Sequence, residues 1–181
     1  MIRGVKCLLR PLDVTDAERF VKWLTDDEVV HFLPFFAPTS LKAEEEFLTS
    51  DPGSETRFCI DTFEGRHIGY CALRANRPMD RCSMLSLFIG ERDVWGQGYG
   101  TDAAITLCTY GFAYQNLNRI WLECAAEHEA AIRCYEKVGF HREGFLRQHC
   151  YRHGRYWDMV AMGMLRGEFQ TRHPERWPSE E

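Results

Sequence analysis

The chain has 181 residues, 45% of them hydrophobic, and a formal net charge of −5. This length and apolar content suit one domain with its own hydrophobic core. The acidic balance disfavours a nucleic-acid-binding protein, no apolar run reaches the ~18 residues of a membrane span, and the charged segment Met1–Leu12 does not resemble a signal peptide.

The first third of the chain predicts one strand followed by helices. Val5–Arg10 is the strand. Thr15–Glu18 has the form of a capping box, and the apolar residues after it recur at helical spacing, which predicts an amphipathic helix. A short helix over Asp27–Phe32 and a third over about Ser40–Thr49 follow. We expect the acidic run Glu44–Glu46 of the third helix to face water.

The middle of the chain changes to strands. Thr56–Asp61 and Arg66–Arg74 predict a hairpin that turns at Glu64-Gly65, a favourable two-residue turn. Cys82–Gly90 is a third strand, apolar enough to be central. After a glycine-rich segment, a helix follows whose apolar residues recur as they do on a buried face. These residues are Ala104, Leu107, Cys108, Gly111 and Phe112.

The last third alternates strand and helix before a closing hairpin. Arg119–Ala126 predicts a strand, and Glu129–Phe140 predicts a helix that Gly139 closes in the left-handed conformation common at helix ends. The two strands of the hairpin are His141–Arg152 and Arg155–Leu165, about a turn at His153-Gly154.

This order of elements predicts an α+β fold with a mixed, mostly antiparallel central sheet and helices on both faces. We expect a single domain over residues 1–169. The last segment, residues 170–181, contains Pro174 and Pro178 and ends in acidic residues, so we expect a frayed C-terminal tail.

The cysteines indicate a reducing compartment. They are spread along the chain, contain no Cys-x-x-Cys pair and fall mostly on apolar faces, which is typical of buried thiols in a cytoplasmic protein. We therefore expect no disulfide framework and no metal site. The eight are Cys7, Cys59, Cys71, Cys82, Cys108, Cys124, Cys134 and Cys150.

The stretch VWGQGYGTDAAITLC, Val94–Cys108, places Gly96, Gly98 and Gly100 directly before a predicted helix. Because glycine loses more backbone entropy on folding than other residues, the cluster requires a tight turn or a ligand that contacts the backbone. A P-loop lysine is missing. The spacing G-x-G-x-G and the antiparallel strands also do not suit a dinucleotide-binding fold. Successive N–H groups before a helix N-terminus nevertheless form an anion cradle.

Three segments together resemble the GCN5-related N-acetyltransferases (GNAT). They are WGQGYGT, RIWLECAAEHEAAIRCYEKVGF and FLRQHCYRHGRYWDMVAMGML. More narrowly, they are similar to the branch that holds the ribosomal-protein N-terminal acetyltransferases and the spermidine acetyltransferases. The resemblance extends from about Lys6 to Phe169 and implies the acyl-CoA N-acyltransferase fold, with acetyl-CoA as co-substrate.

The resemblance also implies the residues that bind acetyl-CoA. A strand edge would pair with the pantetheine arm and direct an N–H at the thioester oxygen, and the glycine loop would hold the pyrophosphate. The edge is Phe88, Ile89 and Gly90, and the loop is Gly96, Gln97, Gly98, Tyr99, Gly100 and Thr101. Trp95 stands where Arg or Gln is commoner in the family. His128 stands where the family has Asn, and it either donates a hydrogen bond to pantetheine or faces water.

The catalytic candidates follow from the needs of amine attack on a thioester: a neutral amine, a polarised carbonyl and a proton for the leaving thiolate. Tyr135 matches the family's proton donor, against the alternative of a core aromatic residue. Glu123 matches the proton acceptor of the ribosomal-protein enzymes, against a solvent-facing strand residue. For Glu143 we favour a structural role. A metal site at His149 and Cys150 is dismissed because neighbouring strand residues point to opposite faces.

We therefore expect a cytoplasmic N-acetyltransferase that moves an acetyl group from acetyl-CoA to a primary amine in a ternary complex. The acceptor stays open between a protein N-terminus and a small amine such as a polyamine, and the oligomeric state between a monomer and a homodimer. The acidic run Asp26–Glu28 either attracts a cationic amine or starts a helix, and we favour the helix start. The alternative function is a non-catalytic acyl-CoA-binding module on the same fold.

Overall fold

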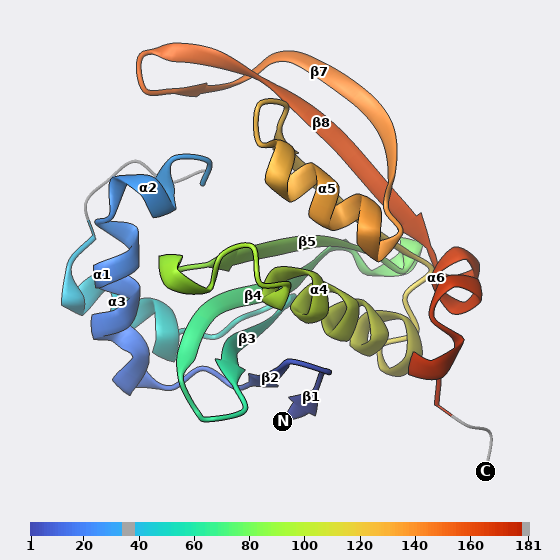
Figure 1. Cartoon of the computed structure of the whole chain (residues 1–181), viewed down its shortest axis with the longest axis horizontal. Helices are drawn as coiled ribbons and strands as arrows, with labels where there is room; N and C mark the ends of the chain where they lie inside the picture. The colour runs from blue at the N-terminus through green and yellow to red at the C-terminus, as the bar shows by residue number, and fades with distance from the viewer. Residues whose placement is uncertain (34–38, 179–181) are drawn as a thin grey trace.

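The computed structural model describes residues 1–33 and 39–178 and is built on one eight-stranded sheet (Figure 1). The strand order is β1-β2-β3-β4-β5-β6-β8-β7. Neighbouring strands are antiparallel except β5 and β6, which are parallel. The strands are β1 Ile2–Arg3, β2 Cys7–Arg10, β3 Glu55–Thr62, β4 His67–Arg77, β5 Cys82–Ile89, β6 Arg119–Ala125, β7 His141–Arg152 and β8 Arg155–Leu165. The predicted fold class, mixed and mostly antiparallel, is confirmed.

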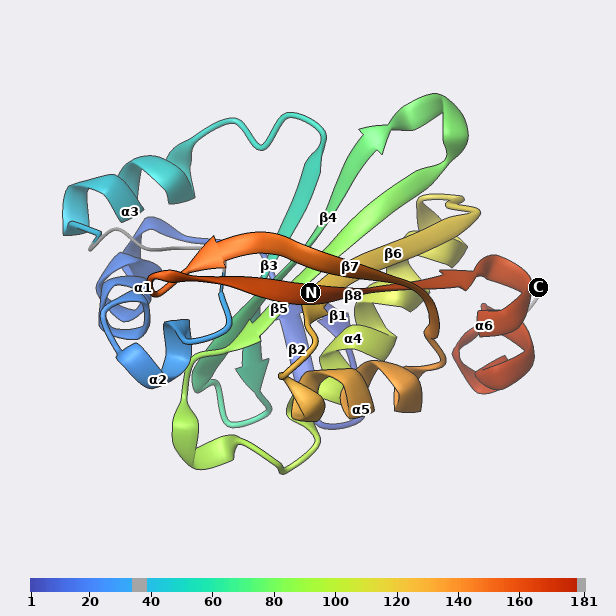
Figure 2. The same ribbon diagram turned by 90° about the horizontal axis from the view of Figure 1, so that it is seen from above.

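Helices cover both faces of the sheet, as Figure 2 shows from above. The buried residues of α1 to α3 form a hydrophobic cluster with one face of the sheet. The buried residues of α4 to α6 belong to a second, larger cluster on the opposite face. The helices are α1 Ala17–Leu24, α2 Asp27–Val30, α3 Leu41–Thr49, α4 Tyr99–Thr109, α5 Glu129–Val138 and α6 Arg166–Arg172.

Strand alternation assigns side chains to these two clusters. In β5, Leu85 and Leu87 pack with the α4 cluster, whereas Phe88 packs with the α1 cluster. In β6, Leu122 belongs to the α4 cluster, so Glu123, one residue further on, points to the opposite face. At this point of β6 the sheet therefore has an apolar side chain on the α4 face and a carboxylate on the opposite face.

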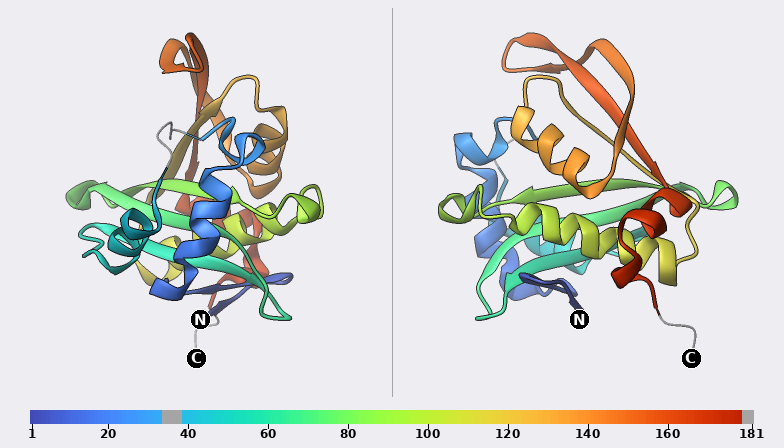
Figure 3. Two further views of the ribbon diagram at one scale, coloured as in Figure 1. Left: turned by 90° about the vertical axis from the view of Figure 1, so that its left-hand side faces the viewer. Right: turned by 45° about the vertical axis from the view of Figure 1, so that its right-hand side comes forward.

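The parallel strands β5 and β6 pair with each other only at their first residues. The paired residues are Cys82 with Arg119, Ser83 with Ile120 and Met84 with Trp121. Beyond Met84 the two strands part. Figure 3 shows the same divergence, because β7 and β8 meet the rest of the sheet near α6 and rise away from β5 toward α2. The second half of β5 is thus a strand edge inside the sheet.

Two details of the first helices differ from the sequence-based prediction. The capping box is formed by Asp13 and Asp16 around a 3₁₀ turn over Val14–Asp16, two residues earlier than predicted. Asp13 accepts the N–H of Thr15, and Asp16 accepts that of Asp13. Glu44 is buried instead of facing water, and its carboxylate accepts a hydrogen bond from the hydroxyl of Thr39 at 2.6 Å.

The C-terminal segment also differs from the frayed tail that we expected from residue 170. Helix α6 runs to Arg172, and a 3₁₀ turn follows over Pro174–Arg176. His173 contacts the carbonyl of Val138 at 2.8 Å, and Arg176 pairs with the buried Asp102 of α4 at 3.2 Å. These polar contacts with the domain hold the segment as far as Arg176. Residues 179–181 lie outside the described residues.

All eight cysteines are free thiols, and five of them are buried. Burial raises the pKa of the Cys124 thiol to about 11, so this side chain is an uncharged part of the core. Within the described part of the chain, no helix combines the length and the apolar character that crossing a membrane requires.

Candidate active site

The glycine loop connects the free end of β5 to helix α4. Gly96 and Gly98 have φ of +74° and +87°, a left-handed conformation that side chains disfavour, and Gly98 is the N-cap of α4. A Cβ atom at Gly96 would meet no atom within 4 Å, so the turn itself requires glycine there. Gly100 lies in the helix at negative φ, where backbone geometry does not demand glycine. The turn therefore explains two of the three glycines, and the open space at Gly96 fits an anion.

Side chains of the loop hold its own backbone in place. The indole N–H of Trp95 donates to the carbonyl of Ile89 at 2.8 Å, and the Gln97 amide donates to the carbonyl of Asp93 at 2.7 Å. Trp95, which departs from the commoner family residue, thus closes the turn between β5 and α4. The cradle is preformed because these contacts fix its backbone without a ligand.

The register of β5 identifies its free edge. The N–H of Gly90 donates to the carbonyl of Ile68 in β4 at 2.8 Å. Because hydrogen-bonded pairs alternate along an antiparallel ladder, the polar backbone groups of Phe88 also face β4. Those of Leu87 and Ile89 face the side where β6 has diverged. This corrects the predicted edge: Ile89 belongs to it, Phe88 and Gly90 do not, and Leu87 was missed.

Gly90 has a structural role instead. A Cβ atom at this position would overlap the indole of Trp23 in α1. Trp23 is buried, and its indole N–H donates to the Glu91 carboxylate at 2.9 Å. A glycine is therefore required here for helix α1 to approach the end of β5.

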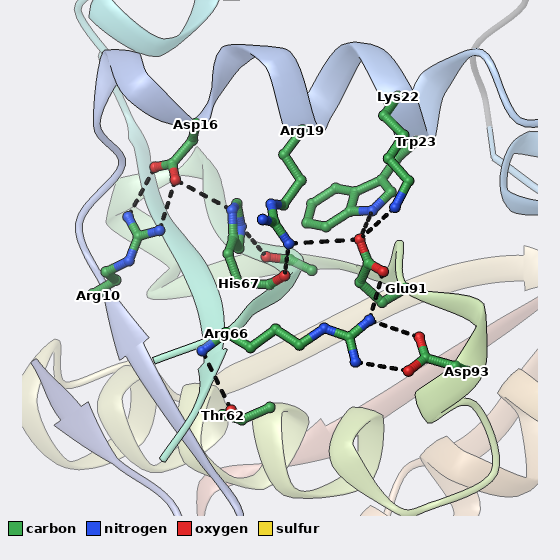
Figure 4. Close-up of polar contacts among 11 residues, drawn as sticks. Arg10, Asp16, Arg19, Lys22, Trp23, Thr62, Arg66, His67, Glu91 and Asp93 are labelled. Carbon is green, nitrogen blue, oxygen red and sulfur yellow. Dashed lines mark hydrogen bonds and ion pairs between the residues drawn. The ribbon is translucent and has the colours of Figure 1, made fainter. Parts of the chain in front are cut away.

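Glu91 joins this end of β5 to two other segments (Figure 4). Its carboxylate, which is 8% exposed, accepts hydrogen bonds from Lys22 at 3.0 Å, from Trp23 and from Arg66 at 2.7 Å. Arg66 also binds Asp93 with both terminal nitrogens. Burial alone would raise the pKa of Glu91, but the hydrogen bonds outweigh burial and lower it to about 2. The start of the glycine loop is thus fixed to α1 and to the β3–β4 turn.

A second polar cluster holds three potential metal ligands, the side chains of Asp16, Cys59 and His67. Figure 4 shows Asp16 and His67 of this cluster beside Arg10. Arg10 already binds both oxygens of Asp16, at 2.8 and 2.7 Å, and also contacts Asp61. A guanidinium on the carboxylate compensates its charge and disfavours a metal cation at the same place. We interpret the cluster as a polar support for α1.

Tyr135 lies on the inner face of α5, which Gly139 ends at φ +119° as predicted. The residue is 7% exposed, and its ring packs edge-on against Phe140 at 5.8 Å. Burial raises the pKa of the hydroxyl far above its usual value, so the Tyr135 hydroxyl stays protonated and neutral near neutral pH. Among the described residues, no side chain hydrogen-bonds to this hydroxyl. These features suit both a core aromatic residue and a proton donor.

Glu123 has a partner that sequence reasoning missed. The ring nitrogen Nε2 of His149 lies 3.4 Å from a carboxylate oxygen of Glu123, and the two side chains are 50% and 23% exposed. The ladder of β7 and β8 is irregular between Leu146 and Cys150. Gln148 lies in this irregular stretch with φ +51°. The regular alternation assumed for residues 149 and 150 is therefore interrupted, and no local pattern could have revealed the pair.

His128 stacks on the ring of Phe32 after α2, with centroids 4.1 Å apart and planes at 11°. Burial, followed by the charge of His31, lowers the pKa of His128, so the ring is neutral near pH 7. The side chain is half-buried between two segments and does not simply face water.

The remaining acidic candidates have structural partners. Asp26 caps α2 by accepting the N–H of Glu28 at 3.0 Å, and it lies 3.7 Å from Arg92. Glu143 is bound by Arg119, which lowers the pKa of the carboxyl group. Both observations agree with the structural roles that the sequence favoured.

Comparisons with known proteins identify the family. A family model described as an acetyltransferase (GNAT) domain matches residues 6–141. The chain is 29% identical over 168 residues to spermidine N(1)-acetyltransferase of Escherichia coli K12, covering 91% of this chain and 89% of that protein. It is 26% identical over 167 residues to the uncharacterized N-acetyltransferase p20 of Bacillus licheniformis, covering 89% and 93%.

Solved structures agree on the fold. The spermidine N-acetyltransferase of Vibrio cholerae, solved in complex with CoA and spermine, superposes with a TM-score of 0.84 at 23% identity and covers 91% of this chain and 98% of its own. A GNAT-family acetyltransferase from Bacillus anthracis gives a TM-score of 0.82 at 21% identity, covering 92% and 99%. The chain therefore belongs to the GNAT acetyltransferase family, and its activity is the transfer of an acetyl group from acetyl-CoA to an amine.

Proposed function

We propose that the acceptor amine attacks acetyl-CoA directly, in a ternary complex assembled where β5 and β6 diverge. The observation that carries the proposal is this divergence, with the backbone edge of Leu87 and the N–H of Ile89 on one side and Glu123 on the other. The Ile89 carbonyl already accepts the indole N–H of Trp95. The unpaired N–H groups of the glycine loop and the N-terminus of α4 would hold the pyrophosphate, each charge-assisted bond contributing about 1.5–3 kcal/mol. The Gln97 N–H is not among them, because it donates to the carbonyl of Val94.

The residues of the chain account for both protons of the reaction. The amine nitrogen forms a bond to the acetyl carbon while the carbon–sulfur bond breaks. Glu123 accepts the proton that the amine must lose, directly or through water, and His149 orients its carboxylate. Tyr135, protonated at neutral pH, donates a proton to the departing sulfur. The products are the acetylated amine and CoA thiol.

The free-energy cost of deprotonating the acceptor is small when the amine is weakly basic. Deprotonating an α-amine of pKa ~8 at pH 7 costs about 1.4 kcal/mol, against about 4.6 kcal/mol for a lysine-like amine of pKa ~10.4. A half-exposed histidine beside Glu123 gives the proton a route to solvent, which favours turnover of either kind of amine.

We propose a small polyamine as the first acceptor to test and a protein N-terminus as the second. Support for the polyamine comes from the spermidine N(1)-acetyltransferases of E. coli and V. cholerae, to which the chain is 29% and 28% identical. The carboxylate of Glu123, on the face of the sheet that α1 and α2 cover, suits a cationic amine.

The test is release of CoA thiol from acetyl-CoA with spermidine, spermine, a peptide with a free N-terminus and the same peptide N-acetylated. We expect thiol release with a free amine and none with the blocked peptide. CoA binding without thiol release from any amine would favour the non-catalytic acyl-CoA-binding module instead.

The cellular setting is part of the same proposal. We infer a cytoplasmic enzyme that needs no metal, supported by eight free cysteines and by a reaction whose proton donor and acceptor are both side chains of this chain. A homodimer stays open beside a monomer, and sedimentation velocity would distinguish them.

A further inference from the structure

A lysine from the N-terminal end of the sheet lies against the glycine loop. Lys6, in the turn between β1 and β2, donates from Nζ to the carbonyl of Gln97 at 2.9 Å, across 91 residues of chain. A Cβ atom placed on Gly98 would lie 3.7 Å from the same Nζ. The ammonium group therefore lies beside the N-cap of α4, where the loop turns into the helix.

The backbone of this lysine is anchored by a buried carboxylate. Asp102, in the first turn of α4, accepts the N–H groups of Val5, Lys6 and Cys7 at 2.9, 2.8 and 3.1 Å. Gly4 lets the chain approach, because a Cβ atom there would overlap the Asp102 carboxylate. The position of Lys6 relative to the loop is thus set by α4 itself.

The charge of Lys6 is not neutralised by the protein. Among the described residues, no carboxylate oxygen lies within ion-pair distance of its Nζ, whereas Arg66 is paired with Glu91 and Asp93. The Gln97 carbonyl takes one of three ammonium protons and leaves two to donate. In a chain of net charge −5, an uncompensated cation at an anion cradle indicates a negatively charged ligand.

We propose that Lys6 binds the pyrophosphate of acetyl-CoA together with the backbone of the glycine loop. The inference rests on the proposed function, since it takes acetyl-CoA as the ligand of the loop. Lysine acts here as a point charge that complements the directional N–H donors of the glycine loop. The ligand chemistry recognised is a diphosphate ester, and the adenine and the 3′-phosphate are not part of the contact.

The test is calorimetric affinity for CoA and for dephospho-CoA, which lacks the 3′-phosphate. Lys6→Met should weaken both about 5- to 10-fold, between the effect of an exposed ion pair and that of a charge-assisted hydrogen bond. Lys6→Arg should retain most of the affinity. Lys42→Met, which removes the same charge from α3 at a side chain that is 84% exposed, is the matched control and should bind as the wild type does.

Two further measurements test whether the loss of affinity comes from a charge contact with the diphosphate. The affinity of Lys6→Met for CoA should depend less steeply on salt concentration than that of the wild type. With S-acetylpantetheine, which lacks the diphosphate, the wild type and Lys6→Met should have equal kcat/KM. Melting temperatures should agree, because the Lys6 side chain is exposed and its backbone N–H keeps its bond to Asp102.

Unchanged CoA affinity in Lys6→Met would overturn the proposal, and so would an equal loss in Lys42→Met. A loss for CoA without a loss for dephospho-CoA would assign the lysine to the 3′-phosphate and overturn the diphosphate contact. If the wild type itself binds no CoA, the proposed function fails, a result distinct from wild-type affinity in the variant.

Discussion

The two sides of the site are built differently. The proposed acetyl-CoA side, which is the edge of β5 with the glycine loop and α5, comes mostly from one stretch of chain, residues 87–138. The proposed acceptor side, which is Glu123 with His149 and the segment after α2, is assembled from strands and a helix far apart in sequence. Phe32 stacks on His128, so the two sides meet there.

This difference shows why one side is recognisable and the other is not. A turn at positive φ and a helix start are local features, so they leave a local pattern of glycines. A contact such as that between Glu123 and His149 depends on strand order and on the irregular ladder of β7, and many residue types could satisfy it.

Tyr135→Phe should have the largest effect, a fall in kcat of about 10²–10⁴, the usual contribution of one positioned proton donor. The ring and its packing on Phe140 remain, so stability and CoA affinity should be near those of the wild type. Stopped-flow kinetics with acetyl-CoA and with a thioester whose thiol is a poorer leaving group measure the effect, which should grow for the poorer one. A variant as fast as wild type on both would make Tyr135 a core aromatic residue.

On the acceptor side, Glu123→Gln should lower kcat about 10²-fold and leave CoA affinity unchanged. His149→Gln should lower it roughly 3- to 10-fold, because it removes one orienting contact. If His149 acts through Glu123, the double variant loses no more than Glu123→Gln alone. His141→Gln, an exposed histidine of the same strand, is the control. Additive losses in the double variant would show that the two residues act separately.

Alanine substitutions at two loop glycines test whether the left-handed backbone conformation at Gly98 requires glycine. Gly98→Ala forces a side chain into φ +87°, which should cost about 1–2 kcal/mol of stability. Gly100→Ala lies in the helix with ordinary contacts, at 3.8 Å or more, and should add about 0.5–1 kcal/mol. Urea denaturation gives both values. Equal stabilities of the two variants would contradict the left-handed cap.

Acid should weaken the attachment of the glycine loop to α1 and to the β3–β4 turn, which Glu91 makes. Since the pKa of Glu91 is lowered from 4.5 to about 2 in the folded protein, its contribution to stability is complete above pH ~4.5 and is lost as pH falls toward 2. Glu91→Gln should therefore be less stable than wild type at neutral pH, with the difference shrinking in that window. Circular dichroism melts from pH 7 to pH 3 measure it, and a constant difference would contradict the pKa shift.

Much of the fold could be predicted because its signals are local. Hydrophobic alternation correctly indicated the β3–β4 hairpin, and Gly139 correctly indicated the end of α5. The hairpin turn spans residues 63–65 instead of the predicted two residues, because the Thr62 N–H donates to the carbonyl of Arg66. The prediction failed where a distant partner decides the outcome. Glu44 has the spacing of a solvent-facing residue but is buried and accepts a hydrogen bond from Thr39, and the predicted tail beyond residue 170 is held through Arg176.

The sequence by itself determined the family, the α+β fold class and the glycine loop, because these depend on periodicity, on backbone conformations that few residues adopt and on a contiguous motif. The tertiary structure decided which backbone groups of β5 are free, that His149 approaches Glu123, and that Lys6 lies beside Gly98. Strand register and long-range packing set these placements. They bring together residues as distant in sequence as Lys6 and Gln97, which are 91 positions apart, and no local pattern encodes such proximity.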